Sequence, residues 1–354
     1  MAGARLKPTD RVPVDYCTRN DVADDLVKLL KLENVEALYK KLGIDSRRFF
    51  VGEHIPEFVE RANKKLGGRS QKSGANYIFH DDGSYEDAWG IVRRPSADGK
   101  YDQWVSGPFS NTTDINAFAW PSLDVIESEE SIKARFAPYA DEYAIIATLN
   151  YPFKVCWHMR GLEVFLCDML EEEEFAAALL EKTAEYELEK ALRAVRAGAD
   201  VISFSGDIAM QNSMMVSVNA WREIDKPIFA RMIKRIKEEN PDVLIYYHSD
   251  GNMEMVIPDM IEIGVDILNP IQPESMDVGE IYRKYGDKIC LHGTISIQET
   301  LPNGTVEDVR AEVQHRMALC EGKGGMIIAP ANHVQGDTPL ENIIEIYKTV
   351  GSYK

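Results

Sequence analysis

The chain has 354 residues, of which 45% are hydrophobic and 28% are charged, so it is typical of a folded globular protein rather than of a disordered, collagen-like or coiled-coil chain. This length suits one large domain or two ordinary domains. The 58 acidic and 40 basic residues give a formal net charge of −18, which repels phosphate backbones and anionic lipids, so we expect neither a nucleic acid nor a membrane as a partner.

The first 140 residues contain two kinds of local pattern. Leu and Val recur at helical spacing in residues 22–42, which predicts one or two short helices within an N-terminal helical segment, residues 1–45. Residues 47–51 are a candidate first strand of a barrel. Residues 76–108 alternate apolar and polar side chains around turn dipeptides, a pattern typical of antiparallel hairpins, so we expect a β-hairpin insertion over residues 76–110.

From about residue 140 onward, the chain repeats a short apolar run, a polar or glycine-rich turn and an amphipathic stretch with helical spacing. This order is typical of βα units. Each apolar run is apolar on both faces, as in parallel strands that are covered on both sides. The candidate strands are residues 143–149, 200–204, 243–247, 266–269, 288–291 and 326–329.

The intervening helices are marked by their ends. Residues 171–197 are rich in Glu, Ala and Leu, residues 220–239 stop before Pro241, and Thr305 and Pro339 open the last two helices. Six clear units, with one or two more hidden in the N-terminal half, predict an α/β fold, a (β/α)8 TIM-type barrel. We expect one domain over residues 1–354, with the N-terminal helical segment and the β-hairpin insertion as elaborations. A doubly wound open sheet is the alternative.

The cysteines and the N-terminus bear on the cellular compartment. The five cysteines include no CxxC pair, which indicates neither a disulfide framework nor a thiolate zinc site. No apolar run approaches the roughly 20 residues of a membrane helix, and residues 1–11 lack the apolar core of a signal peptide. We therefore expect a cytoplasmic protein.

Polar residues just after each apolar run are the candidate site residues, because the loops that follow the strands of a barrel carry its active site. These residues are Asn150 with the downstream His158, Arg160 and Glu163; Ser205 and Asp207; His248 and Asp250; Gln272 and Glu274; His292 and Thr294; and Asn332 and His333. The sequence contains no Walker A loop, dinucleotide fingerprint or Gly-x-Ser-x-Gly elbow.

His248 is the strongest of these candidates. Residues 243–247 have the pattern of a buried strand that delivers the imidazole to the barrel rim, where it can ligate a metal or move a proton. A structural histidine bonded to a backbone carbonyl is the alternative. Asp207 follows Gly206, which allows a sharp turn toward the barrel axis, and a helix N-cap is the alternative role. His292 fits a catalytic and a structural role equally well.

Several segments in the second half of the chain resemble the uroporphyrinogen decarboxylase superfamily. The resemblance covers roughly residues 140–350 and implies a (β/α)8 barrel, in agreement with the pattern of the elements. The segments are His248-Ser249-Asp250-Gly251-Asn252, residues 257–274, Gly293-Thr294-Ile295, residues 300–305, Ala329-Pro330-Ala331-Asn332 and Asp337-Thr338-Pro339.

The superfamily contains decarboxylases that need no cofactor and methyltransferases that use zinc beside a corrinoid protein. A true decarboxylase would have an Arg-Gln-x-Gly-Arg segment near the N-terminus, but residues 12–20 lack the paired arginines, so an octa-acid tetrapyrrole is a poor substrate. The thiol-activating methyltransferases have a His-x-Cys and a second Cys near the last strand. Those positions are Asp250 and Asn332 here, so the resemblance implies a harder set of nitrogen and oxygen ligands that includes His248.

The resemblance is closest to the corrinoid-dependent branch. It implies a methyltransferase that moves a methyl group from an O-methyl or N-methyl donor to a corrinoid protein with the help of Zn²⁺, and it allows a homodimer. The alternatives are a decarboxylase or lyase of a small carboxylic acid or a tetrapyrrole, and a non-catalytic barrel that binds a small molecule. The expected catalytic residues are His248, Asp207, Asp250 and His333; the substrate-binding residues are Tyr247, Asn332, Gln272, Trp157 and Arg160; and the metal ligands are His248, Asp250 and Glu163.

Overall fold

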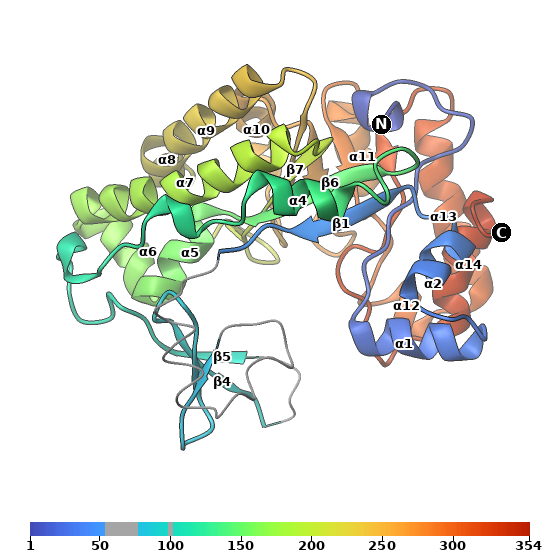
Figure 1. Ribbon diagram of the computed structural model, residues 1–354. Helices are drawn as coiled ribbons and strands as arrows, with labels where there is room; N and C mark the ends of the chain where they lie inside the picture. The colour runs from blue at the N-terminus through green and yellow to red at the C-terminus, as the bar shows by residue number, and fades with distance from the viewer. Residues whose placement is uncertain (54–76, 98–101) are drawn as a thin grey trace.

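The protein is a (β/α)8 barrel, as the sequence predicts (Figure 1). The computed structural model describes residues 1–53, 77–97 and 102–354. Seven parallel strands form the barrel sheet in the order β1-β6-β7-β8-β9-β10-β11. Their bounds are β1 Ser46–Phe50, β6 Ala144–Asn150, β7 Val201–Ser205, β8 Leu244–His248, β9 Ile267–Asn269, β10 Cys290–His292 and β11 Met326–Ile327.

An irregular N-terminal segment, residues 13–18, closes the barrel between β11 and β1. Val14 and Thr18 form parallel bridges to Ile328 and Val334, in the chain that follows β11. On the other side, the Asp45 N–H donates to the carbonyl of Val14. Residues 13–18 therefore fill the eighth strand position, although the apolar pattern did not predict them as a strand.

Helices surround the barrel and cover its outer face (Figure 1). The long α7 packs against α9 and against β6. The π-helix η5 precedes α9, where the sequence predicted a continuous helix from residue 220 to 239. Bounds of the helices in this layer are α4 Glu129–Phe136, α5 Pro152–Arg160, α6 Leu162–Glu171, α7 Glu173–Arg196, α8 Val218–Ala220, η5 Trp221–Asp225, α9 Lys226–Glu239, α10 Ile257–Ile263, α11 Val278–Tyr285, α12 Thr300–Asn303, α13 Val306–Cys320 and α14 Leu340–Val350.

The alternation of side chains along the strands separates two layers of core. One set of residues faces the barrel interior, where apolar side chains cluster with Ala4 of the N-terminal 3₁₀ turn η1 (Gly3–Arg5). This inner cluster consists of Ala4, Ile146, Val201, Leu244, Tyr246, Ile267 and Cys290. Alternate residues, such as Ile245 and Tyr247, belong to the larger core beneath the helices. Because side chains on a strand alternate, His248 lies on the inward face with Leu244 and Tyr246.

Two elaborations accompany the barrel. Helix α2 (Val35–Leu42) packs against the C-terminal α14, and α1 (Asn20–Leu29) packs against α2. The Lys354 N–H donates to the carbonyl of Lys41. A four-stranded antiparallel sheet projects beside α5 (Figure 1). The indole N–H of Trp104 in this sheet donates to the carbonyl of His158 in α5. Its strands are β2 Ile78–Phe79, β3 Tyr85–Glu86, β4 Val92–Pro95 and β5 Asp102–Ser106.

Residues 76 and 98–101 of the predicted insertion lie outside the described residues. The assignment of the whole chain to one domain stays a prediction. Within the described part of the chain, no helix has the length and apolar character that crossing a membrane requires.

Candidate functional site

The candidate site lies where β7 and β8 end. His248 is the last residue of β8, and Asp250 follows it by two positions. Asp207 comes from the loop after β7, beyond Gly206, where an added Cβ would lie 2.6 Å from the Cβ of Tyr151. Because parallel strands end at the same rim of the barrel, the two loops bring one imidazole and two carboxylates together.

Asp207, His248 and Asp250 form a group that has the composition of a metal site. Each offers one ligand atom, and these atoms all lie within 4.8 Å of one another. The Nε2 atom of His248 is 3.8 Å from Oδ1 of Asp207, and the N–H of Asp250 donates to the same oxygen at 2.9 Å. Among the residues that the structure describes, this is the one group of three or more such side chains.

Asp250 has an oxygen with no partner. Its Oδ2 accepts a hydrogen bond from Nδ2 of Asn332 at 2.5 Å, whereas its Oδ1 is buried and accepts none in the described structure. Burial raises the pKa of Asp250, and the negative charge of Asp207 adds to the increase. An unpartnered buried carboxylate oxygen is costly, and a bound cation would relieve that cost. These residues therefore fit a metal ion with nitrogen and oxygen ligands.

A row of hydrogen-bonded side chains leads inward from His248. Nδ1 of His248 is 2.6 Å from Oδ1 of Asn269, and Nδ2 of Asn269 is 2.7 Å from Nδ1 of His292. Nε2 of His292 is 3.0 Å from Oδ2 of Asp15, which also accepts from Arg48 at 2.7 Å. The sequence pattern fits a catalytic and a structural role of His292 equally well, and it does not point to Asn269, Asp15 or Arg48.

The inward face of the strands could have revealed part of this row. Arg48 shares the inward face of β1 with Ser46, and Asn269 and His292 share the inward faces of β9 and β10 with Ile267 and Cys290. Polar side chains on the inward face of buried strands are unusual and need partners. This alternation was the signal that could have identified them.

Other predicted residues lie around the group in supporting positions. Oε1 of the buried Gln272 accepts from the N–H of Gly251 at 2.7 Å, which holds the turn after Asp250. His333 is exposed, and its Nδ1 lies 3.1 Å from Oδ1 of Asn332. Tyr247 is fully buried beneath the helices, where its hydroxyl donates to the carbonyl of Gly206, so the structure does not bring it to the barrel mouth.

Three predicted residues on α5 and α6 are not brought to the group. Arg160 is buried and donates to both carboxylate oxygens of Asp168, at 2.6 and 3.1 Å. Trp157 packs on the ring of His158, with ring centroids 3.9 Å apart. Glu163 is exposed in the first turn of α6. The sequence predicted them from their position after β6, but they belong to two helices rather than to the loop at the strand end.

A cavity of about 540 Å³ lies at the ends of β1 and β6. Phe50 and Asn150 line it from the barrel, Lys154 and His158 from α5, and several aromatic and charged residues from the small sheet. The lining from the small sheet and the loops next to it includes Tyr77, Tyr85, Asp87, Trp89, Arg93 and Asp102. Lys154 connects the cavity with the Asp207–His248–Asp250 group, because its positive charge lowers the pKa of Asp250. Lys154 was not predicted from the sequence, because it lies inside a helix.

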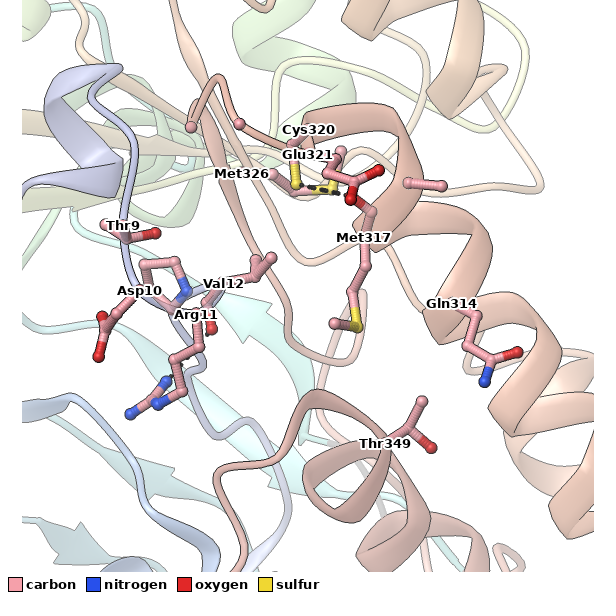
Figure 2. A pocket seen from close by; sticks show the side chains of 14 residues that line it. Thr9, Asp10, Arg11, Val12, Gln314, Met317, Cys320, Glu321, Met326 and Thr349 are labelled. Carbon is pink, nitrogen blue, oxygen red and sulfur yellow. Dashed lines mark hydrogen bonds between the residues drawn. The ribbon is translucent and has the colours of Figure 1, made fainter.

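A second cavity of about 440 Å³ lies elsewhere. Figure 2 shows Thr9 to Val12 on one side of it and α13, with Gln314, Met317 and Cys320, on the other. It reaches Met326, the first residue of β11, and so lies toward the N-terminal ends of the strands. In barrels of this type the chemistry takes place at the opposite ends of the strands. We therefore do not place the functional site there.

Comparisons with known proteins agree with the barrel and with the resemblance in the sequence. MtaA of Methanosarcina barkeri, a methylcobamide:CoM methyltransferase, is 25% identical over 220 residues, which are 62% of this chain and 60% of that protein. The match thus spans about three fifths of the relative's length. A methyltransferase structure from Methanosarcina mazei has a TM-score of 0.70 at 19% identity and covers 99% of this chain and 96% of that chain.

A B12-independent methionine synthase from Shewanella sp. W3-18-1 has a TM-score of 0.54 at 13% identity, covering 98% of this chain and 94% of that chain. At these identities the two solved structures show the fold alone. The profile of the family described as uroporphyrinogen decarboxylase (URO-D) matches residues 122–353, which is more than half of the chain. The chain therefore belongs to the uroporphyrinogen decarboxylase family, and its similarity to MtaA fits the methyltransferase-like branch of that family.

Proposed function

We propose that the protein is a methyltransferase that moves a methyl group from an O-methyl or N-methyl donor to the corrinoid of a partner protein, with the help of a metal ion. The observation that carries the proposal is the convergence of Asp207, His248 and Asp250 at the strand ends. Membership of the URO-D family and the similarity to a methylcobamide:CoM methyltransferase support it.

Zn²⁺ is the metal that we propose for this group. Catalytic zinc sites commonly have three protein ligands from His, Asp, Glu or Cys, with a further position left open. Here Nε2 of His248, a carboxylate oxygen of Asp207 and the unpartnered Oδ1 of Asp250 would hold the ion. When bound, it would act as a Lewis acid on the heteroatom that carries the methyl group.

The protein's own side chains fix the orientation of the proposed ligands. Asn332 donates to Oδ2 of Asp250, which leaves the buried Oδ1 without a hydrogen-bond partner. The backbone N–H of Asp250 donates to Oδ1 of Asp207, the oxygen that lies 3.8 Å from Nε2 of His248, and so holds this carboxylate beside the imidazole. Gln272 fixes the following turn through Gly251. Such partners of metal ligands commonly set the affinity of the site.

We assign the donor molecule to the cavity of about 540 Å³, because its volume suits a small organic ligand and Lys154 joins it to the group. When the methyl group leaves, the C–O or C–N bond breaks and its electron pair stays on the heteroatom. An alkoxide or phenolate is a poor leaving group unless it is protonated or bound by a cation. We assign this proton to Nζ of Lys154, which lines the cavity from α5.

The proposal is tested by mixing the purified protein with a Co(I) corrinoid protein and a panel of methoxylated aromatic compounds and methylated amines. We expect the absorbance of the methylated corrinoid to appear with at least one donor, and His248→Gln to abolish it. His315→Gln, at an exposed histidine on α13, is the matched control and should retain activity. Release of carbon dioxide from small carboxylic acids, without methylation over the whole panel, would instead identify a decarboxylase.

A further inference from the structure

A row of hydrogen bonds leads from Asp15 through His292 and Asn269 to His248, and only one assignment of donors and acceptors fits it. Asp15 is 4% exposed and accepts from Ser46 at 2.7 Å and from Arg48 at 2.7 Å. Although burial opposes its ionisation, Arg48 and the hydrogen bonds from His292 and Ser46 hold the pKa of Asp15 well below its ordinary value. An ionised carboxylate only accepts hydrogen bonds, so Nε2 of His292 must carry the proton that it shares with Asp15.

The direction of the remaining bonds follows from that proton. Burial lowers the pKa of His292, so its ring is neutral and its Nδ1, opposite the protonated Nε2, is an acceptor. The group that faces this acceptor at 2.7 Å must be the amide NH₂ of Asn269. The same NH₂ lies 3.4 Å from the carbonyl oxygen of His292, which also only accepts. Two acceptor atoms of His292, Nδ1 and the backbone carbonyl oxygen, therefore fix the orientation of the Asn269 amide.

The amide oxygen of Asn269 then faces Nδ1 of His248 at 2.6 Å. Since that oxygen only accepts, Nδ1 of His248 carries the proton of the neutral ring, and Nε2 is left with a free lone pair. Nε2 is the atom that faces Asp207. The chain also makes room for this arrangement, because a Cβ on Gly293 would lie 2.5 Å from Nδ2 of Asn269.

We infer that Asp15 is a positioning residue: acting through His292 and Asn269, it fixes the tautomer of His248 in which Nε2 can bind a metal ion or accept a proton. The inference rests on the proposed function only in giving His248 its role. Asp15 lies in the irregular segment that closes the barrel, 277 residues before His292 in the sequence. This segment would therefore determine which nitrogen of the imidazole at the barrel mouth carries the proton.

Nitrogen NMR of the histidine rings tests the inference on the wild-type protein without any metal or substrate. In protein labelled with ¹⁵N-histidine and freed of metal, we expect Nδ1 of His248 to be of the protonated type and Nε2 of the unprotonated type. His292 should show the reverse pattern. Spectra of His248→Gln, His292→Gln and His315→Gln assign the signals. Wild-type protein with the proton of His248 on Nε2 would overturn the inference.

Two substitutions of His292 separate the direction of the hydrogen bonds from simple packing. In His292→Gln, the side-chain oxygen can accept from Asn269 and the NH₂ can donate to Asp15, so the tautomer of His248 and the Zn²⁺ affinity should be retained. In His292→Leu the side chain fills the space but cannot bond to Asn269 or Asp15. A mixture of His248 tautomers should then appear, and Zn²⁺ binding should weaken about 10- to 100-fold.

Equal behaviour of the two variants would overturn the inference, because it would show that only volume matters at this position. Circular dichroism establishes that each variant is folded. If the wild-type protein binds no Zn²⁺, the proposed metal fails, but the nitrogen signals still decide the inference. The two failures are thus distinguishable.

Discussion

The buried carboxyl group of Asp225 should make the protein less stable as the pH rises. Asp225 is 1% exposed, and its Oδ2 accepts from the hydroxyl of Tyr151 at 2.8 Å. Burial raises its pKa from 3.8 to about 7. Tyr151 in turn packs against Gly206, which precedes Asp207. The titration of Asp225 therefore reports on the core beneath the candidate site.

The sign and the size follow from linkage. Between the unfolded pKa of 3.8 and the folded pKa of about 7, the folded state binds more protons than the unfolded state, so the free energy of unfolding falls as the pH rises through this interval. Above the folded pKa the loss is complete. The difference of about three pKa units corresponds to roughly 4 kcal/mol at alkaline pH. Asp225→Asn can still accept from Tyr151 and cannot ionise, so it should remove this loss.

Urea unfolding followed by circular dichroism measures the effect. We compare the free energy of unfolding of Asp225→Asn with that of the wild type at each pH. This difference should shift in favour of the variant by about 3 kcal/mol as the pH rises from about 5 to about 8. Asp242→Asn, at a side chain that is 82% exposed, is the matched control. A difference between Asp225→Asn and wild type that stays constant across this range would refute the reasoning.

Three further substitutions test other parts of the structure. Lys190→Met removes a cation that is 1% exposed and lies between two carboxylates. The free energy of unfolding in urea should fall by about 3–5 kcal/mol at neutral pH and by less in acid. A decrease that does not depend on pH would contradict this. Arg160→Ala leaves Asp168 buried and unpaired, so the free energy of unfolding should fall by about 3–5 kcal/mol while the Zn²⁺ content stays the same. A changed Zn²⁺ content at unchanged stability would instead place Arg160 in the site. Gly206→Ala should displace Asp207 and weaken Zn²⁺ binding about 10- to 100-fold in a chelator competition, and unchanged affinity would show that the loop does not hold this carboxylate.

The barrel could be predicted because its strands are short apolar runs that recur at regular intervals. Predicted strands such as residues 200–204 and 243–247 differ from β7 and β8 by one residue at each end. His248, Asp207 and Asp250 followed from the rule that parallel strands end at one rim. That rule depends on the chain's local pattern alone, so it applies before any tertiary contact is known.

The inner row of side chains could not be predicted in the same way. Asp15 lies in a segment that forms isolated bridges rather than a regular strand, and its partner His292 is 277 residues away. No local periodicity encodes such a pairing. Glu163 follows β6 in the sequence, but it lies in the first turn of a second helix after that strand, where its side chain is exposed. Lys154 was missed because it lies within an amphipathic helix, where a lysine ordinarily faces solvent.

The central claim is that Asp207, His248 and Asp250 hold a metal ion, and the Zn²⁺ content of the purified protein tests it most directly. After incubation with Zn²⁺ and removal of excess, mass spectrometry of the metal should find about one equivalent per chain in the wild type and in the matched control Glu163→Gln, and very little in His248→Ala and Asp250→Asn. Wild-type protein without zinc, or His248→Ala with its zinc intact, would contradict the claim.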